Sequence, residues 1–410
     1  MGMADPSRLR FRLSLLMFLQ YAPSGAIVPL FSLRLEELGF TALQVGWGCA
    51  GLALASLIAP LVAGQVADRW VSSERCIALC AAVAGVLLWL LASLRTFPEV
   101  MSVTLAYWMV MVPALTLSIA LCFAHLSNPE QQYGPVRLWG TVGWVVPIWG
   151  LAGWFALLGP DGDLADMFRV AAVLSWTYAA YALTLPHTPP ARRGASWLAP
   201  LAALTLLRRR GFAVYTVSAL TLCVTLPFSG QVAPLLLKHL GVPRPLLCLT
   251  LTIAQSMEVV ALGLLPMILL RLGMRGTMVL GLSAWVVALT LLMIGSPLGL
   301  VMGSLTLNGV NICCFLVAGQ VFVNRLARGS IRASAQGLLT FINGVGLLIG
   351  NVLTGVVRRA VDEEFPPTFA VAAVIAVVLT VGFALGFPGE QAMLAAEEEI
   401  EPSSAPNRAQ

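Results

Sequence analysis

The sequence predicts an all-α integral membrane protein of about twelve transmembrane helices, arranged as two six-helix bundles. Composition is the first reason, since 59% of residues are hydrophobic, only 10% are charged, and the mean hydropathy is +0.88. A soluble domain carries roughly a quarter charged residues. Length is the second, because 410 residues accommodate twelve crossings of about 20 residues each. The third is a polar break near the middle, at residues 187–210.

Hydropathy windows place the individual crossings on either side of this break. Before it they cover residues 12–34, 43–65, 75–95, 99–124, 135–158 and 165–186. After it they cover residues 211–237, 245–270, 274–295, 297–324, 333–357 and 367–387. The predicted divisions are a polar N-terminal tail (1–11), a first bundle (12–186), a basic linker (187–210), a second bundle (211–387) and an acidic tail (388–410). The acidic tail has a composition typical of disordered segments.

Charge asymmetry predicts the orientation of these helices. Most of the 24 Lys and Arg residues fall on one side if the crossings alternate, and the positive-inside rule assigns that side to the cytoplasm. Both termini are therefore expected in the cytoplasm of a cell (inner or plasma) membrane. The first apolar run is longer than a signal peptide and has no small-residue cleavage pattern, so we expect it to be a membrane helix.

Several function classes are disfavoured by the sequence. The net charge of +5 is dispersed between apolar segments, which argues against a nucleic-acid partner. His125, His187 and His239 lie near predicted helix ends and form no catalytic triad or metal cluster, and no phosphate-binding loop is present. The sequence therefore predicts neither an enzyme nor a cofactor or metal site, and no ATP-driven pump.

Two ionisable residues inside the predicted crossings are the strongest functional candidates. Glu258 lies in the middle of residues 245–270, where a charge costs about 2.5 to 3.5 kcal/mol even on low insertion scales. It is expected to face a cavity or a cation, or to form a structural pair. Arg137 opens residues 135–158, and either reaches the membrane surface or points inward and pairs with Glu258 across the bundles.

The connection after the second crossing resembles the signature of the major facilitator superfamily. Gly64, Asp68 and Arg69 stand at the signature spacing, and Arg75 supplies its final basic residue. In that superfamily this loop is a cytoplasmic latch between helices. The resemblance implies two six-helix bundles that are parallel repeats and that expose a central site to each side in turn.

Four further segments resemble the nucleoside:proton symporter family of this superfamily. They are Phe18-Leu19-Gln20-Tyr21, Arg137-Leu-Trp139-Gly140-Thr141, Thr184-Leu-Pro186-His187 and Ile331-Arg332-Ala-Ser334-Ala-Gln336-Gly337. The resemblance covers nearly the whole chain. It implies a secondary transporter that takes up nucleosides with protons. We also expect a monomer, since each pair of bundles encloses its own pathway. The positions that match the family's solute contacts are Arg137, Thr141, Trp144, Gln255 and Glu258.

Each of these positions also has a structural interpretation. Gln255 shares a helix face with Glu258 and either binds ribose hydroxyls or bridges two helices. Trp144 either stacks on a nucleobase or packs in the bilayer. Glu258 is the candidate for proton coupling. Three further polar residues either line the pathway or join helices: Gln20, Asn308 and Asn311.

The chain departs from the family pattern at two places. Cys313-Cys314-Phe315 stands where the family usually has an acidic residue before phenylalanines, which bears on proton coupling. Leu226 and Ser229 stand where polar residues are expected, which bears on nucleoside specificity. Alternatives therefore stay open: a carrier of an aromatic acid or a sugar, an uncoupled facilitator, or a membrane sensor.

Overall fold

The structure is a computed structural model that describes residues 6–58, 72–126, 129–159, 162–188, 203–326 and 331–389. All regular secondary structure in these ranges is helical. Within them, nine helical segments are long and apolar enough to cross a membrane. The predicted all-α membrane architecture is therefore confirmed, while the count of twelve crossings stays a prediction.

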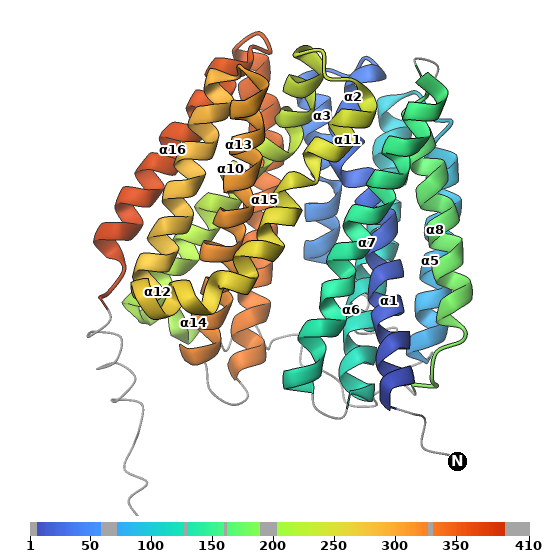
Figure 1. Cartoon of the computed structure of the whole chain (residues 1–410), viewed down its shortest axis with the longest axis horizontal. Coiled ribbons are helices and arrows are strands. Elements are labelled where there is room, and N and C mark those ends of the chain that lie inside the picture. The colour runs from blue at the N-terminus through green and yellow to red at the C-terminus, as the bar shows by residue number, and fades with distance from the viewer. Residues whose placement is uncertain are drawn as a thin grey trace, which may run out of the picture.

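The first half of the chain forms one bundle, on the right in Figure 1. Its elements are α1 (Pro6–Ile27), η1 (Val28–Leu30), α2 (Phe31–Glu37), α3 (Ala42–Cys49), α5 (Ser73–Leu91), α6 (Phe97–His125), α7 (Pro129–Leu158) and α8 (Asp166–Ala182). Helix α1 packs against α7 and α8, and α5 packs between α6 and α8. Helices α1 and α2 continue each other through η1, so one apolar segment spans Ser7–Glu37.

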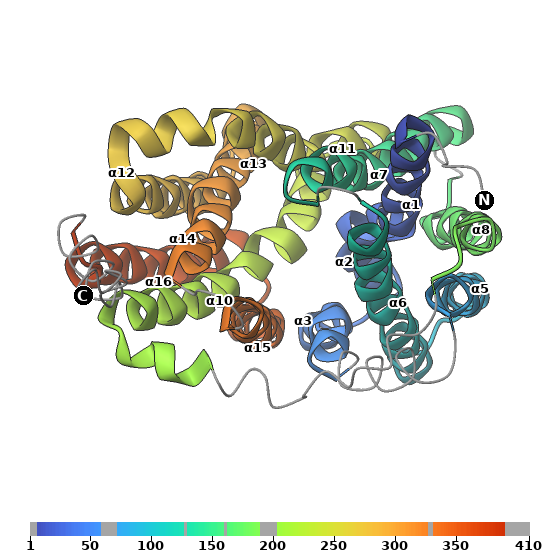
Figure 2. The same ribbon diagram turned by 90° about the horizontal axis from the view of Figure 1, so that it is seen from below.

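The second half forms the other bundle, on the left in Figure 1. Its elements are η3 (Ala203–Arg208), α10 (Arg210–His239), α11 (Arg244–Leu251), α12 (Ile253–Ile294), α13 (Leu298–Asn311), η4 (Ile312–Val317), α14 (Ala318–Leu326), α15 (Ile331–Ala360) and α16 (Phe365–Gly386). Helix α10 packs against α15 and α16, and α12 packs against α13 and α16. Figure 2 shows the two bundles side by side.

Helix α12 contains two antiparallel arms. Gly273 interrupts it with φ 65° and ψ 179°, a conformation that glycine adopts without a Cβ clash. The chain folds back at this residue, as Figure 2 shows at the edge of the second bundle. The interruption agrees with the separate crossings predicted at residues 245–270 and 274–295. The second arm ends at Gly295, whose φ of 71° is typical of a helix C-terminus.

The molecule has two faces, which we name by the chain segments they hold. The terminal face holds the start of α1 at Pro6 and the end of α16 at Gly386. The distal face holds the end of α2 at Glu37 and the start of α11 at Arg244. The bundles contact each other where α3 packs against α15, α7 against α11, and α2 against α10.

Glycines allow the closest of these approaches. A Cβ on Gly46 would lie 2.7 Å from the carbonyl oxygen of Asn351, and a Cβ on Gly355 would lie 2.7 Å from that of Ala42. The backbones of α3 and α15 are therefore almost in contact, as small residues permit in membrane helices. Within the first bundle, a Cβ on Gly25 would collide with the backbone of Trp144. Helices α1 and α7 are therefore in backbone contact at this tryptophan.

A similar approach in the second bundle predicts a stability effect. A Cβ on Gly309 of α13 would collide with the Ala254 carbonyl and lie 2.7 Å from the Glu258 amide nitrogen of α12. Gly309→Val is expected to destabilise the protein by about 1–3 kcal/mol, because α13 must move away from α12. Gly299→Val is the matched control, since a Cβ there meets nothing within 4 Å. Thermal unfolding of both purified variants checks this, and equal midpoints would contradict it.

Candidate functional site

Arg137 lies half-buried on α7 and faces the first helix. Its guanidinium carbon is 4.3 Å from the centre of the Tyr21 ring of α1. A cation over an aromatic face is stabilised by about 0.5–2 kcal/mol, with the larger value for desolvated pairs. Arg137 also interacts electrostatically with Glu258 of the other bundle. None of the described ion pairs joins the two, so this interaction is longer than a direct salt bridge.

Glu258 lies on the first arm of α12, midway between Arg244 and Gly273. It is partly buried, and the close approach at Gly309 brings α13 against its backbone. Its charge also acts on the thiol of Cys313 in η4. The cysteine at the position where the family usually has an acid therefore lies within electrostatic range of Glu258.

Several buried polar atoms on the helices that carry these charges, or next to them in the bundle, have no protein partner. The indole Nε1 of Trp144 and the side-chain Oε1 of Gln255 have no hydrogen-bond partner in the protein. The same holds for the Asn308 Oδ1 and for both amide atoms of Asn311. Nearly all buried polar atoms in folded proteins are hydrogen-bonded, so such a group from α7, α12 and α13 suits a polar solute. Thr141 is half-buried one turn beyond Arg137.

Gln20 has a different environment from the other predicted pathway residues. It is buried, and its Oε1 accepts hydrogen bonds from the Tyr178 hydroxyl at 2.5 Å and the Ser118 hydroxyl at 3.3 Å. These bonds join α1, α6 and α8 inside the first bundle. The structure therefore supports the helix-joining interpretation of Gln20.

The predicted latch lies mostly outside the described residues, which include Arg75 but not Gly64, Asp68 or Arg69. Arg75 is exposed in the first turn of α5. Beside it, the buried Glu74 contacts His187 Nδ1 at 2.8 Å and accepts from the Thr188 N–H at 3.0 Å. Glu74 thereby ties the start of α5 to residues 187–188, a link that the sequence did not predict.

A cavity of about 260 Å³ lies between the bundles, on the distal side of Arg137. It opens against Ile27 and Val28, about two turns beyond Tyr21 along the first helix. Its lining residues come from both bundles and include four aromatic side chains: Phe31, Tyr107, Trp108 and Phe168. None of the five predicted solute contacts lines it. The cavity is thus separate from the five residues predicted to contact the solute.

Two amide side chains of the second bundle form the polar side of this cavity. Gln231 of α10 donates from Nε2 to Asn351 Oδ1 of α15 at 2.5 Å. Opposite them, the hydroxyls of Ser32 and Thr104 are buried without a partner. Sequence reasoning missed this pair, although two amides inside apolar segments are a signal in themselves.

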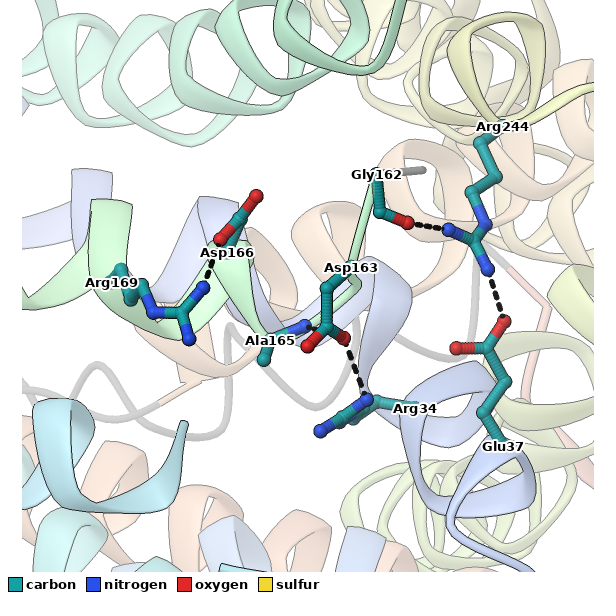
Figure 3. A network of polar contacts seen from close by, with 8 residues as sticks. All are labelled: Arg34, Glu37, Gly162, Asp163, Ala165, Asp166, Arg169 and Arg244. Carbon is teal, nitrogen blue, oxygen red and sulfur yellow. Dashed lines mark hydrogen bonds and ion pairs between the residues drawn. The ribbon is translucent and has the colours of Figure 1, made fainter. Parts of the chain in front are cut away.

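Charged side chains join the bundles at the distal face (Figure 3). Arg244 of α11 donates to Glu37 of α2 at 2.9 Å and to the Gly162 carbonyl. Lys238 and Arg358 lie 3.7 and 3.6 Å from the carboxylate of Glu36. We call these five side chains the distal clasp: Glu36, Glu37, Lys238, Arg244 and Arg358. A hydrogen bond of 3.0 Å from Trp149 Nε1 to Thr252 Oγ1 adds a further link between the bundles.

The clasp rests on a loop that is fixed within the first bundle. Asp163 accepts from Arg34 at 2.9 Å and from the Ala165 N–H at 2.9 Å (Figure 3). Partial burial raises the pKa of Asp163, but the Ala165 N–H and the charge of Arg34 outweigh it, so the pKa lies below its ordinary value. The carboxylate stays charged at neutral pH and holds the neighbouring Gly162 carbonyl where Arg244 reaches it.

Comparison with known proteins places the chain in a family. The family model for the nucleoside H⁺ symporter matches residues 7–392. The xanthosine permease of Escherichia coli (strain K12) is 31% identical, over 92% of this chain and 96% of the relative. The nucleoside permease NupG of the same organism is 26% identical, over 85% and 87%.

Solved structures agree with this assignment. The nucleoside transporter NupG superimposes with a TM-score of 0.81 at 25% identity, over 93% of this chain and 100% of that chain. A D-xylose-proton symporter superimposes with a TM-score of 0.71 at 14% identity, which shows the shared fold alone. The fold is therefore of the major facilitator type, and the protein is a transporter and not an enzyme. The chain belongs to the nucleoside H⁺ symporter family.

Proposed function

We propose that the protein takes up nucleosides together with protons by alternating access. The site would lie between the bundles and be formed by Arg137, Thr141, Trp144, Gln255 and Glu258. The observation that supports this proposal is that α7, α12 and α13 carry buried, unpartnered polar atoms, and that α7 and α12 also carry two opposite charges that interact between the bundles. A solute bound there contacts both bundles at once, as alternating access requires.

The chemistry of these side chains suits a nucleoside. Ribose hydroxyls donate to the unpartnered Gln255 Oε1 and to the Glu258 carboxylate, and accept from the guanidinium of Arg137. The indole of Trp144 offers a ring for stacking and an Nε1–H for a base carbonyl. Asn308 and Asn311 supply further amide groups next to Gln255, because α13 packs against this part of α12.

Glu258 is the proposed proton carrier. A carboxylate held in the membrane interior near a cation can exchange a proton when solvent access changes. Coupling requires that solute and proton alter each other's affinity reciprocally, and Glu258 would contact both. Cys313-Cys314 stands where the family usually has an acidic residue. Glu258 alone would therefore carry the proton in this protein.

The topology follows from the distribution of charge. The terminal face, with both chain ends, would lie in the cytoplasm of the inner membrane, and the distal face outside. The distal clasp would then close the outer end, which supports the assignment of an inward-facing or occluded state. The cavity beside Gln231 and Asn351 would lie on the outer part of the route. One chain encloses the whole pathway, which favours a monomer.

Uptake into proteoliposomes tests the proposal. Radiolabelled uridine, adenosine and xanthosine are offered with and without an inward proton gradient, and we expect accumulation only with the gradient. Excess unlabelled nucleoside should compete, whereas phenylpropanoate and a disaccharide should not. Competition by either of the latter two, with none by nucleosides, would replace the proposed substrate class. Equal accumulation with and without the proton gradient would exclude proton coupling.

The clasp predicts a shift between the two access states. Glu36→Gln/Glu37→Gln removes the carboxylates that hold Lys238, Arg244 and Arg358. The two partly exposed pairs, with Lys238 and Arg244, contribute about 0.2–1 kcal/mol each. Losing about 1 kcal/mol raises the outward-open population about fivefold. Cys49 lines the cavity, so its labelling by a membrane-impermeant thiol reagent from outside should accelerate by this factor.

The control for that experiment removes one carboxylate without separating the bundles. Glu363→Gln fits, because Glu363 pairs at 3.2 Å with Arg358 of its own bundle. Labelling of Cys49 should stay unchanged in this variant and disappear in Cys49→Ser. Equal acceleration by Glu363→Gln would show that general charge loss, and not the clasp, controls opening.

A further inference from the structure

An apolar groove of about 590 Å³ runs along the outer surface between α10 and α16. Its lining residues are Ala213, Val214, Val217, Ser218, Thr221, Val374, Ile375, Val378, Leu379, Gly382 and Phe383. They recur at three- and four-residue steps on both helices, so each helix presents one face to the groove. Val217, Val374 and Val378 remain 62%, 63% and 67% exposed. The groove therefore faces the hydrocarbon of the bilayer.

The terminal end of this groove is bounded by arginines. Arg210 lies one turn before Val214 on the same face of α10, and its Nε donates to the Gly386 carbonyl of α16 at 3.2 Å. Arg275 of α12 donates to the Ala384 carbonyl of the same helix end. Two positive side chains thus close the groove at the membrane surface.

Two more arginines precede them. Arg208 is exposed, and the Nη1 of Arg209 is buried without a hydrogen-bond partner. None of the ion pairs described in residues 203–326 and 331–389 includes any of these four arginines. Helix α10 begins at Arg210 with no side-chain cap, so its N-terminal dipole adds positive potential at the same place.

We infer that this groove binds an anionic phospholipid. One acyl chain lies along the valine-lined faces of α10 and α16, and the phosphate and its acidic headgroup lie against Arg208, Arg209 and the start of α10. Clustered arginines beside membrane helices on the cytoplasmic side attract anionic headgroups. A zwitterionic lipid fills the groove equally well but leaves the arginines uncompensated. This site is distinct from the solute pathway.

Native mass spectrometry of the delipidated full-length protein tests the site. Dioleoyl phosphatidylglycerol should be retained at one copy per chain under conditions that remove dioleoyl phosphatidylcholine. Arg208→Gln/Arg209→Gln should weaken phosphatidylglycerol binding about fivefold for each arginine removed. Neither side chain makes a described hydrogen bond, so the variant should fold. Arg8→Gln/Arg10→Gln removes the same charge from the terminal face of the first bundle and should have no effect.

A second variant tests the acyl chain separately from the charge. A Cβ on Gly382 meets nothing within 4 Å, so Gly382→Phe should fold and fill the groove. It should abolish the single retained phosphatidylglycerol. Equal retention of the two lipids, an equal loss in the Arg8/Arg10 variant, or unchanged retention in Gly382→Phe would each overturn the inference. Inorganic phosphate that displaces the lipid completely would show an anion site without a lipid.

Discussion

Glu258→Gln is expected to abolish gradient-driven accumulation of nucleoside while preserving exchange. Glutamine keeps the size and the hydrogen-bonding oxygen of the side chain but cannot carry a proton. The internal concentration in proteoliposomes should then never exceed the external one, whatever pH gradient is imposed. Exchange of labelled for unlabelled solute should continue, because both access states can still bind the solute. Initial uptake and counterflow, measured on the same preparation, separate the two effects.

Glu99→Gln is the matched control for this variant. Glu99 lies exposed in the first turn of α6, where its carboxylate accepts from the Thr96 hydroxyl at 2.6 Å. Its replacement removes one carboxylate far from the site and should leave accumulation intact. If Glu258→Gln still accumulates nucleoside against its gradient, another group carries the proton. If it loses exchange as well, the negative charge itself is needed for solute binding or folding, which contradicts the expectation that glutamine preserves binding.

Replacement of Arg137 by alanine is expected to weaken the binding of the solute strongly. The change removes the cation over the Tyr21 ring, the opposite charge that faces Glu258, and the donors offered to solute oxygens. Loss of a hydrogen bond to a charged group costs about 1.5–3 kcal/mol, which corresponds to about a 10- to 150-fold weaker affinity. Ligand-induced thermal stabilisation measures this loss, since a bound solute stabilises the folded state by mass action.

Arg137→Lys distinguishes the geometry of the guanidinium from its charge. A lysine keeps the charge but has no planar fork to lie over the ring and contact two solute oxygens. It should therefore restore expression and folding but not affinity. Arg8→Ala serves as the control at the start of α1. Full affinity in Arg137→Lys would show that only the positive charge matters, and full affinity in Arg137→Ala would remove Arg137 from the proposed site.

Most of the architecture was predictable from hydropathy alone. The predicted crossings at residues 99–124 and 211–237 correspond to α6 (Phe97–His125) and α10 (Arg210–His239). Such agreement is expected because the bilayer requires about 20 apolar residues in each crossing. Glycines refine the ends: the turn at Gly273 separates two crossings that would otherwise join. The angles at which these helices cross have no comparable signal, since they depend on which small residues meet.

The site was less predictable, for a physical reason. Glu258 and Arg137 are costly in a membrane, so their presence alone indicates a role. Burying the uncharged amides of Gln231 and Asn351 in a membrane costs less free energy than burying a charge. Their importance therefore depends on the partner that each one contacts. Gln20 was predicted as a possible pathway residue, but its amide oxygen accepts hydrogen bonds from Tyr178 and Ser118 within one bundle. Side chains that act through contacts between bundles become recognisable only when the bundles are placed together.

The distal clasp has a consequence for the height of the barrier to opening. A single deeply buried ion pair would have to break in one step and would cost several kcal/mol. Here Glu36 is shared between Lys238 and Arg358, while Glu37 holds Arg244, and all but Arg358 are accessible to water. Water can therefore replace the Lys238 and Arg244 contacts one at a time, and Arg358 keeps Glu363 as a partner when it leaves Glu36. The distal end can therefore be held closed and still open quickly, because no single step breaks all of its ion pairs.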